Sequence, residues 1–196
     1  MSSLTTDFTY KQLTEPVEEP VTLAEAKAHL RVDLDEENGL ISSFIVVARE
    51  QCELEARRSF VKRSMRYMCH SWPTDLGKTL PQRPVVSITH VKVYDWEDAA
   101  TAIASSNYRL TDDDRVRFTS DFSWPVRARL ADGYEVEYIA GYGDASAVPQ
   151  RYKQAILLLV GHFYENREAV TLAQGMTATV LPLAVQSLLM TDRGSW

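Results

Sequence analysis

Two spacings of apolar residues divide the chain into a middle part and two outer parts. Between about Glu36 and Arg58, apolar residues recur every three or four positions, which is the spacing of one helix face. From residue 62 to 147, short runs alternate apolar and polar positions instead, and proline and glycine separate these runs. From residue 148 the helical spacing returns. The pattern therefore predicts helices at both ends of the chain and strands between them.

The first two predicted helices lie between residues 22 and 58. Thr22-Leu-Ala-Glu25 has the sequence of a capping box, in which a hydroxyl and a carboxylate each accept a hydrogen bond from an exposed backbone N–H. The second helix, from about Glu36 to Arg58, is expected to bury a wide apolar stripe made of Leu40, Ile41, Phe44, Ile45, Val47, Ala48 and Cys52. Its solvated outer face is expected to carry Arg49, Glu50, Glu53 and Arg57.

The middle part contains one strong strand candidate and several weak ones. Residues 85–94 are the clearest β-former, because valine and isoleucine are frequent there and Val91 and Val93 alternate with polar neighbours. Shorter candidates cover residues 64–72, 108–110, 116–119 and 133–140, and the proline-rich residues 73–84 are expected to form a loop. In the last candidate, Glu135 and Glu137 alternate with apolar residues, which predicts a strand with one wet face.

A long helix is predicted over residues 148–170, after Gly141 and Gly143 end the last strand. Its residues 155–160 are apolar without a break, so a helix here needs enclosure on all sides, either by the chain's own helices or by a neighbouring subunit. It is too short to span a bilayer, which needs about 20 apolar residues. The candidate core or subunit-interface residues are Ile156, Leu157, Leu158, Leu159, His162, Phe163 and Tyr164.

The last helix and the tail complete the pattern. Leu181-Pro182 begins a final helix, and residues 191–196 follow its apolar set as a short polar tail. This tail contains Arg193 and Trp196, two residue types that are enriched at interface hot spots. The tail is therefore a candidate contact segment.

The order of elements predicts an α+β fold that is mainly a helical bundle with a small inserted β-rich segment. Residues 21–61 and 148–190 are expected to form the bundle, and residues 62–147 the insertion. Residues 1–20, which are rich in proline and glutamate, are expected to form an extended or mobile arm. Residues 191–196 remain as the tail.

The net charge of −6 is located entirely in the first 60 residues. Those residues hold twelve acidic and six basic side chains, whereas the remaining residues hold fifteen of each. A protein that grips DNA through its phosphates shows a basic patch, and this sequence shows the reverse. An acidic surface could instead let DNA slide past without binding.

No motif in the sequence indicates a catalytic centre, a metal site or a cofactor. The four histidines are far apart, and Cys52 and Cys69 form no metal-binding or redox motif. Asp112–Asp114 lacks the glycine and the distal glutamate of a calcium-binding loop. There is no glycine-rich phosphate loop, no secretory signal and no transmembrane segment. We therefore expect a protein that is not an enzyme and binds neither a cofactor nor a membrane.

Two blocks of the sequence resemble one protein family. Residues 135–170 contain EVEYIAGYGDA followed by VPQRYKQAILLLVGHFYENREAV, and residues 21–33 read VTLAEAKAHLRVD. These blocks resemble the head–tail connector (adaptor) proteins of long-tailed bacteriophages and gene transfer agents, specifically the larger members with a β-rich insertion. The resemblance covers roughly residues 17–190, and it is loose between the two blocks.

The resemblance implies a structural virion protein that is made in the bacterial host cytoplasm and resides in the neck of the particle. Such proteins form a ring, commonly of twelve subunits, beneath the portal protein, and present a surface to a further neck or tail-completion protein. DNA would pass through the ring without sequence-specific binding. The resemblance further implies that a terminal segment reaches the portal, which makes Arg193 and Trp196 candidate portal-binding residues.

Two other classes of function are weaker alternatives. A nucleic-acid-binding regulator with a helical core and a β wing would need lysine and arginine clustered on one helix, whereas the longest helices here are mixed or acidic. An enzyme ranks third, because the sequence shows no catalytic constellation.

Overall fold

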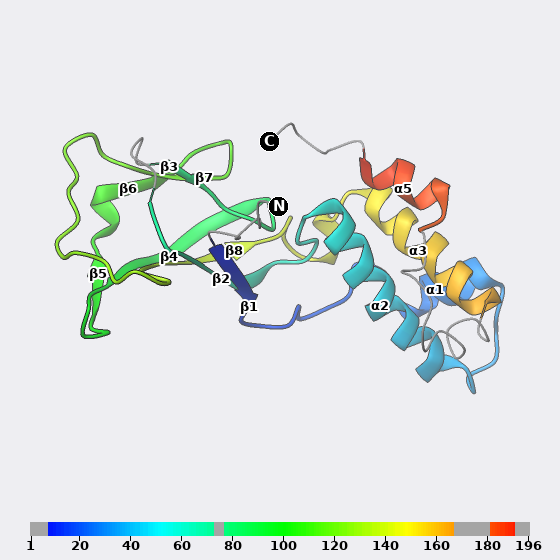
Figure 1. Ribbon diagram of the computed structural model, residues 1–196. Coiled ribbons are helices and arrows are strands. Elements are labelled where there is room, and N and C mark those ends of the chain that lie inside the picture. The colour runs from blue at the N-terminus through cyan, green and yellow to red at the C-terminus, as the bar shows by residue number, and fades with distance from the viewer. Residues whose placement is uncertain (1–7, 73–76, 167–180, 191–196) are drawn as a thin grey trace, which may run out of the picture. The chain divides into compact units, whose positions relative to one another are not determined.

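A computed structural model describes residues 8–72, 77–166 and 181–190 of the chain. These residues form four α-helices and eight strands (Figure 1). They divide into two compact units. The β unit combines the residues up to Pro16 with Lys62–Tyr142 and contains all eight strands. The helical unit combines Val17–Val61 with the residues from Gly143 onward and contains all four helices.

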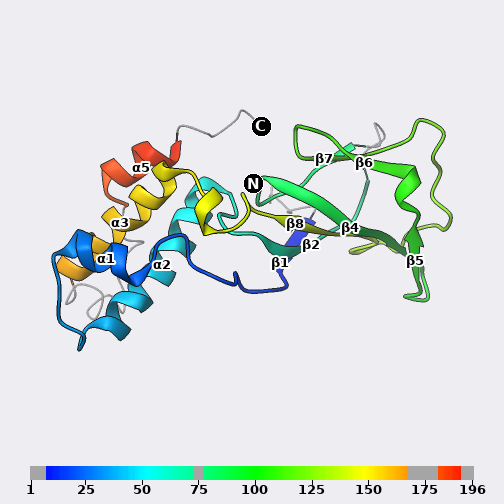
Figure 2. The ribbon, with the colours of Figure 1, turned by 180° about the vertical axis from the view of Figure 1, so that it is seen from behind.

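The helical unit is organised around one central helix. Its helices are α1 (Leu23–Leu30), α2 (Asn38–Ala56), α3 (Gln150–Glu165) and α5 (Leu183–Met190). Helix α3 packs against the other three, and the two opposite views show it lying between α2 and α5 (Figures 1 and 2). Its buried side chains belong to Tyr152, Ala155, Ile156, Leu159, Val160 and Phe163.

Hydrogen bonds at Thr22 confirm the predicted capping box at the start of α1. The backbone N–H of Glu25 donates to the Thr22 hydroxyl over 3.2 Å, and the Thr22 N–H donates to the Glu25 carboxylate over 2.7 Å. These two bonds satisfy donors that the first helical turn leaves without partners. The hydrogen bonds from Thr22 also lower the pKa of Glu25, because they favour its charged form.

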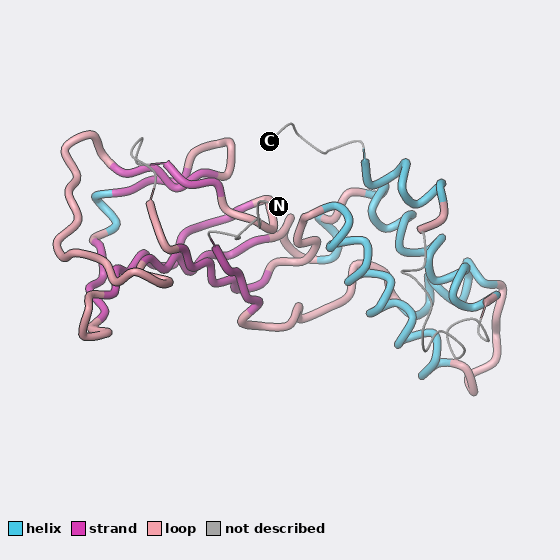
Figure 3. The backbone as a smooth tube through the Cα atoms, in the orientation of Figure 1, coloured by secondary structure: helices cyan, strands magenta, loops and turns pink. Residues whose placement is uncertain are grey.

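The β unit consists of two antiparallel sheets (Figure 3). The five-stranded sheet has the order β1 (Phe8–Gln12), β2 (Arg63–Cys69), β8 (Tyr134–Ala140), β4 (Val85–Tyr94) and β5 (Ala100–Ile103). The three-stranded sheet has the order β3 (Gly77–Thr79), β7 (Arg115–Phe118) and β6 (Tyr108–Leu110). Short 3-10 helices follow β5 at Ser105–Asn107 and precede α3 at Ala145–Ala147.

A single hydrophobic core connects the two sheets. One face of the five-stranded sheet contributes Met65, Tyr67, Cys69, Val91, Val93, Val136 and Tyr138, and the three-stranded sheet contributes Val116 and Phe118. An aromatic cluster extends this core at one end, where Trp124 lies 5.0 Å from Phe118 and 4.6 Å from Tyr134 between ring centroids. The β unit therefore has a hydrophobic core of its own.

The predicted fold class is wrong in its proportions. The structure is a mixed α+β fold with four helices and eight strands among its described residues, not a mainly helical bundle with a small insertion. The cause lies in the strands β1, β3 and β5, which the sequence pattern did not predict. All three are edge strands of three to five residues. β3 and β5 contain few large apolar side chains, and β1, in which Phe8 and Tyr10 alternate with polar residues, lies in the segment that was predicted to be an arm.

A helix that crosses a membrane has to be long and apolar. Within residues 8–72, 77–166 and 181–190, no helix combines the length and the apolar character that such a crossing requires.

Candidate functional site

The face of the five-stranded sheet that points away from the core carries a network of charged side chains. Strand β8 contributes Glu135 to the centre of this network, and the flanking strands contribute Arg66, His90, Lys92 and Tyr94. The Glu135 carboxylate lies 2.9 Å from His90 Nε2 and accepts a hydrogen bond from the Tyr94 hydroxyl over 3.1 Å. Arg66 Nε and Lys92 Nζ lie 3.4 and 3.7 Å from it.

These neighbours bury Glu135 on the face that was predicted to be wet. Its exposed fraction is 2%, although it stands on the polar side of the strand. Desolvation by burial raises the pKa of Glu135, but the hydrogen bond from His90 and the charge of Arg66 oppose it, with further help from Tyr94 and Lys92. The net effect is a pKa below the ordinary value of a glutamate. Glu135 is therefore held as a buried carboxylate.

Three groups of this network could geometrically hold a metal ion. The ligand atoms of His90, Glu135 and Glu137 lie within 4.8 Å of one another. However, Arg66 and Lys92 already place positive charges against the same carboxylates. These side chains would repel a cation, so the group is better described as an ion-pair network.

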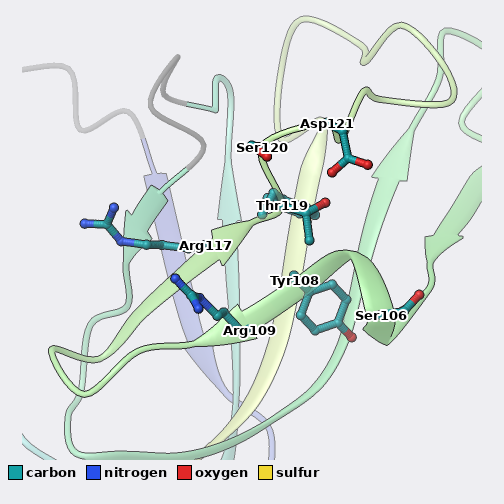
Figure 4. A pocket seen from close by; sticks show the side chains of 8 residues that line it. Ser106, Tyr108, Arg109, Arg117, Thr119, Ser120 and Asp121 are labelled. Carbon is teal, nitrogen blue, oxygen red and sulfur yellow. The ribbon is translucent and has the colours of Figure 1, made fainter.

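A second candidate is a hollow on the three-stranded sheet. It has a volume of about 690 Å³ and is lined by Ser106, Tyr108, Arg109, Arg117, Phe118, Thr119, Ser120 and Asp121. Arg109 and Arg117 stand directly opposite each other on β6 and β7, and their side chains lie side by side (Figure 4). We call these two residues the arginine pair. Asp121 lies on the far side of Thr119 from them (Figure 4).

The arginine pair lacks a salt bridge within the described part of the chain. Neither Arg109 nor Arg117 has a carboxylate oxygen within 4.0 Å there. The pKa of Asp113 is lowered mainly by a hydrogen bond from Thr111, and the charges of Arg115 and Arg117 add smaller contributions in the same direction. The hollow therefore lies beside two arginines that form no salt bridge with another described residue, while Phe118 belongs to the hydrophobic core on the opposite side of the strand.

The α3 residues that were predicted as core or interface divide into two groups. Ile156, Leu159 and Phe163 are buried within the helical unit. Leu157, Leu158, His162 and Tyr164 are half-buried, so the helical unit does not enclose this helix on all sides. Tyr164 donates a hydrogen bond to Glu37, just before α2. The other two predicted site residues, Arg193 and Trp196, lie outside the described residues.

Helix α2 presents an exposed apolar ridge that includes Leu40 and Val47, two residues that the sequence pattern placed in the core. Leu40, Val47 and Leu54 follow one another at intervals of seven residues and are all exposed, Leu54 to 68%. The buried side of the same helix carries Ile41, Ile45 and other residues. The signal that could have revealed this ridge is the distribution of apolar residues around most of the helix circumference, which exceeds what one core can cover.

The segment between α1 and α2 forms an acidic loop of residues 33–37. Asp35 forms a salt bridge with Lys27 over 2.9 Å, and hydrogen bonds from Lys27 and Asn38 lower its pKa. Asp33 and Glu36 are exposed, and neither forms a salt bridge with another described residue. Leu34, between them, is 64% exposed. This loop is a concentrated acidic surface with one apolar side chain at its centre.

Comparisons with known proteins identify relatives of the chain. The family model of phage gp6-like head–tail connector proteins matches residues 20–122, which is more than half of the chain. No curated protein sequence matches it.

Three solved structures share the fold at 23–24% identity. They are the neck of an empty gene transfer agent particle computed with C6 symmetry (TM-score 0.75, 23% identity, 93% of each chain), the virion of a native gene transfer agent particle (TM-score 0.72, 24% identity, 92% of each chain), and the neck of a native gene transfer agent particle computed with C12 symmetry (TM-score 0.70, 23% identity, 92% of each chain).

Proposed function

Because the chain belongs to the phage gp6-like head–tail connector family, we propose that it forms a ring in the particle neck that joins the portal to the tail. As a member of this family it is a structural virion protein of the neck. The observation that carries the proposal is the match over residues 20–122, which runs from the segment before α1 to beyond β7 and so includes parts of both units.

A ring is supported by the neighbours in structure and by the exposed surfaces of the helical unit. The neck structures with a similar fold were computed with sixfold and twelvefold symmetry, so we propose twelve copies. An apolar ridge on α2 and the half-buried residues of α3, among them Leu157 and Leu158, are suited to contacts with neighbouring copies. DNA would pass through the lumen without sequence-specific contacts.

The nucleic-acid-binding regulator is not supported. The family match identifies a connector, and the longest described helix, α2, carries Glu50, Glu53 and Glu55 beside a single arginine, Arg49. A regulator would need a basic helix face for the phosphates. No catalytic role is proposed.

The portal contact is assigned to the tail, residues 191–196. Arg193 and Trp196 are of the residue types that dominate interface energies. Deleting residues 191–196 should leave the melting temperature nearly unchanged and abolish binding to purified portal complexes. The matched control is Ser195→Ala, which should bind as the wild type does. Wild-type binding by the truncated protein would place the portal contact elsewhere.

Complementation of particles tests the function itself. Cells that package DNA without this protein should accumulate filled heads without tails, and purified protein added to these heads should restore tail attachment. Attachment of tails in its absence would contradict the connector function, whatever the outcome for the tail deletion.

A further inference from the structure

The apolar ridge of α2 belongs to a stripe with the spacing of a helix–helix contact. The residues of this stripe follow one another at alternating steps of four and three positions: Leu40, Phe44, Val47, Gln51 and Leu54. Such steps keep one side of a helix facing a partner helix along its whole length. The three ridge residues are exposed, and the two residues between them are half-buried. At 1.5 Å per residue, the stripe is about 21 Å long.

The ridge points away from the core of its own unit. Ile45 is buried and Val47 is exposed, although they are only two positions apart on α2. Two positions on an α-helix point about 160° apart. The core that α2 shares with α3 therefore does not cover the ridge. Contiguous exposed apolar side chains of this kind mark surfaces that another protein covers.

Helix α5 has a second exposed apolar face. Val185 is buried, whereas Leu183 and Met190 stand on the outer side of the helix, Leu183 with an exposed fraction of 82%. Ser187 lies between them, again at steps of four and three positions. We call Leu183, Ser187 and Met190 the α5 outer face. None of the eight residues of α5 is charged, and a helix without a charged side is normally covered on all sides.

The polar residue of the α5 outer face is suited to burial in a contact. The Ser187 hydroxyl donates a hydrogen bond to the Ala184 carbonyl over 2.8 Å. Because this donor is already satisfied within its own helix, a partner that covers it leaves no hydroxyl hydrogen without an acceptor. Ser187 and Ala184 are also small, so they leave room for a larger side chain of a partner helix.

The symmetry of a ring selects the partner of each face. A cyclic assembly of more than two copies uses two different surfaces on each copy, which meet head to tail. The ridge and the α5 outer face lie on the two helices that α3 separates (Figures 1 and 2). Pairing of the ridge with a second ridge would instead give a twofold dimer, which has no free ridge to continue into a ring.

We propose that the apolar ridge of one copy packs against the α5 outer face of the next copy. This inference rests on the proposed function, since the ring supplies the neighbouring copy. From Leu183 to Met190 the α5 outer face is about 11 Å long, so it covers about half of the stripe on α2. Both surfaces contribute apolar side chains, and the contact depends on shape and on exclusion of water rather than on charge.

Charges placed on both faces test the contact, whichever way the two helices cross. One variant carries Val47→Lys and Leu54→Lys on the ridge, and the other carries Leu183→Glu and Ser187→Glu on the α5 outer face. Each variant alone should need at least about tenfold more protein than the wild type to place rings on half of the purified portal complexes. The reason is that a charge then enters an apolar contact. Electron microscopy across a concentration series measures the fraction of portals with a ring.

The chain that carries all four substitutions distinguishes a contact from two unrelated defects. If the two faces meet, the lysines of one copy lie against the glutamates of the next copy. Assembly should then recover by at least about tenfold relative to either parent variant. Two unrelated defects would add in this variant instead of cancelling.

Val46→Lys is the matched control for Val47→Lys. Val46 is the same residue type, is the next residue on the same helix and is also exposed, but it lies outside the ridge. The two positions point about 100° apart. Val46→Lys should therefore assemble as the wild type does. Equal weakening by the two single substitutions would overturn the assignment of the contact to the ridge.

Three further results would overturn the inference. The first is wild-type assembly of both parent variants. The second is a combined variant that stays as weak as its parents, which would show that the two faces meet different partners. The third is loss of the helical circular dichroism signal in a parent variant, which would show that the face is covered within its own chain. Wild-type protein that forms no ring on portals would instead contradict the proposed function, so the two failures are distinguishable.

Discussion

Glu135 is a buried carboxylate of the β unit that is surrounded by charged and polar side chains. Replacing it by glutamine keeps its shape and removes the charge that His90, Tyr94, Arg66 and Lys92 surround. We expect the free energy of unfolding at neutral pH to fall by about 1.5–3 kcal/mol, the range for a hydrogen bond to a charged group. Urea unfolding followed by tryptophan fluorescence measures it, because Trp72, Trp96 and Trp124 all lie in the β unit.

The pH dependence of this effect has a definite sign. The pKa of Glu135 is lowered in the folded state, so its carboxylate stabilises the fold above the ordinary pKa of a glutamate, 4.5. This contribution is lost as the pH falls through the lowered pKa. The difference between wild type and Glu135→Gln should therefore shrink as the solution is acidified. A difference that grows in acid would contradict the assignment.

Glu137→Gln is the matched control for Glu135→Gln. Its carboxylate stands on the same face, two residues along β8, but it is more exposed and its charged neighbours are 3.6–3.7 Å away. We expect a clearly smaller loss of stability. Equal losses in the two variants would show that burial of Glu135 has no energetic weight.

Arg49 plays the corresponding role in the helical unit. Its guanidinium lies 2.8 Å from Glu19 and 2.9 Å from Glu53, and its exposed fraction is 2%. Arg49→Met should cost about 3–5 kcal/mol, because it removes one partner from a buried ion pair. The helical signal in circular dichroism should be lost at lower urea than in the wild type. Glu50→Gln removes only an exposed partner at 3.5 Å and should change stability little.

For single residues, the sequence identifies the residue type but not which side chains surround it in the fold. The helical pattern of α2 placed Arg49 and Glu53 on a solvated face, whereas the structure buries both. The cover comes from distant parts of the chain, since Glu19 pairs with Arg49 and the Phe60 N–H donates to Glu53. The helix sequence alone contains no information about these partners. The sequence did not predict the arginine pair for the same reason, because Arg109 and Arg117 become neighbours only when β6 pairs with β7.

Among the elements, α3 allows a comparison of two neighbouring leucines. Leu159 is buried to 1% exposure, and Leu158 is half-buried. Leu159→Asp should unfold the helical unit, because a buried unpaired carboxylate costs several kcal/mol. Leu158→Asp should give folded protein that associates more weakly, if this side of α3 faces a neighbouring copy.

Circular dichroism and sedimentation separate the two effects. The first measures whether each variant retains its helical signal, and the second whether folded protein still associates. A folded Leu159→Asp variant would contradict the central position of α3 in the helical unit. A Leu158→Asp variant that folds and assembles normally would exclude this side of α3 from the ring contact.

The elements with strong periodicity were predicted well from the sequence. The strand at residues 85–94 and the short strand at 108–110 have the predicted bounds, and α2 lies within its predicted range. The edge strands β1, β3 and β5 were missed, and β3 is one of the three strands of the second sheet, so the β unit is larger than predicted. Edge strands gain stability from pairing with a neighbour rather than from burial of alternate side chains, so their sequences contain little signal.

For the whole molecule, the charge distribution predicts weak interaction with DNA. The net charge of −6 lies in the first 60 residues, and the arginine pair is bordered by aspartates. We expect no binding of duplex DNA tighter than the non-specific range of about 10⁻⁴–10⁻⁶ M at physiological salt. Fluorescence anisotropy with a labelled duplex measures this. Binding that is tighter, or that depends on DNA sequence, would support the alternative function, a nucleic-acid-binding regulator.

Electron microscopy of the protein mixed with purified portal complexes tests the central claim most directly. The connector account predicts an additional ring of twelve copies bound to one end of each portal, into which the β unit and the helical unit can be placed as separate bodies. Portals that remain bare at saturating protein concentration, while the protein is folded by circular dichroism, would contradict it.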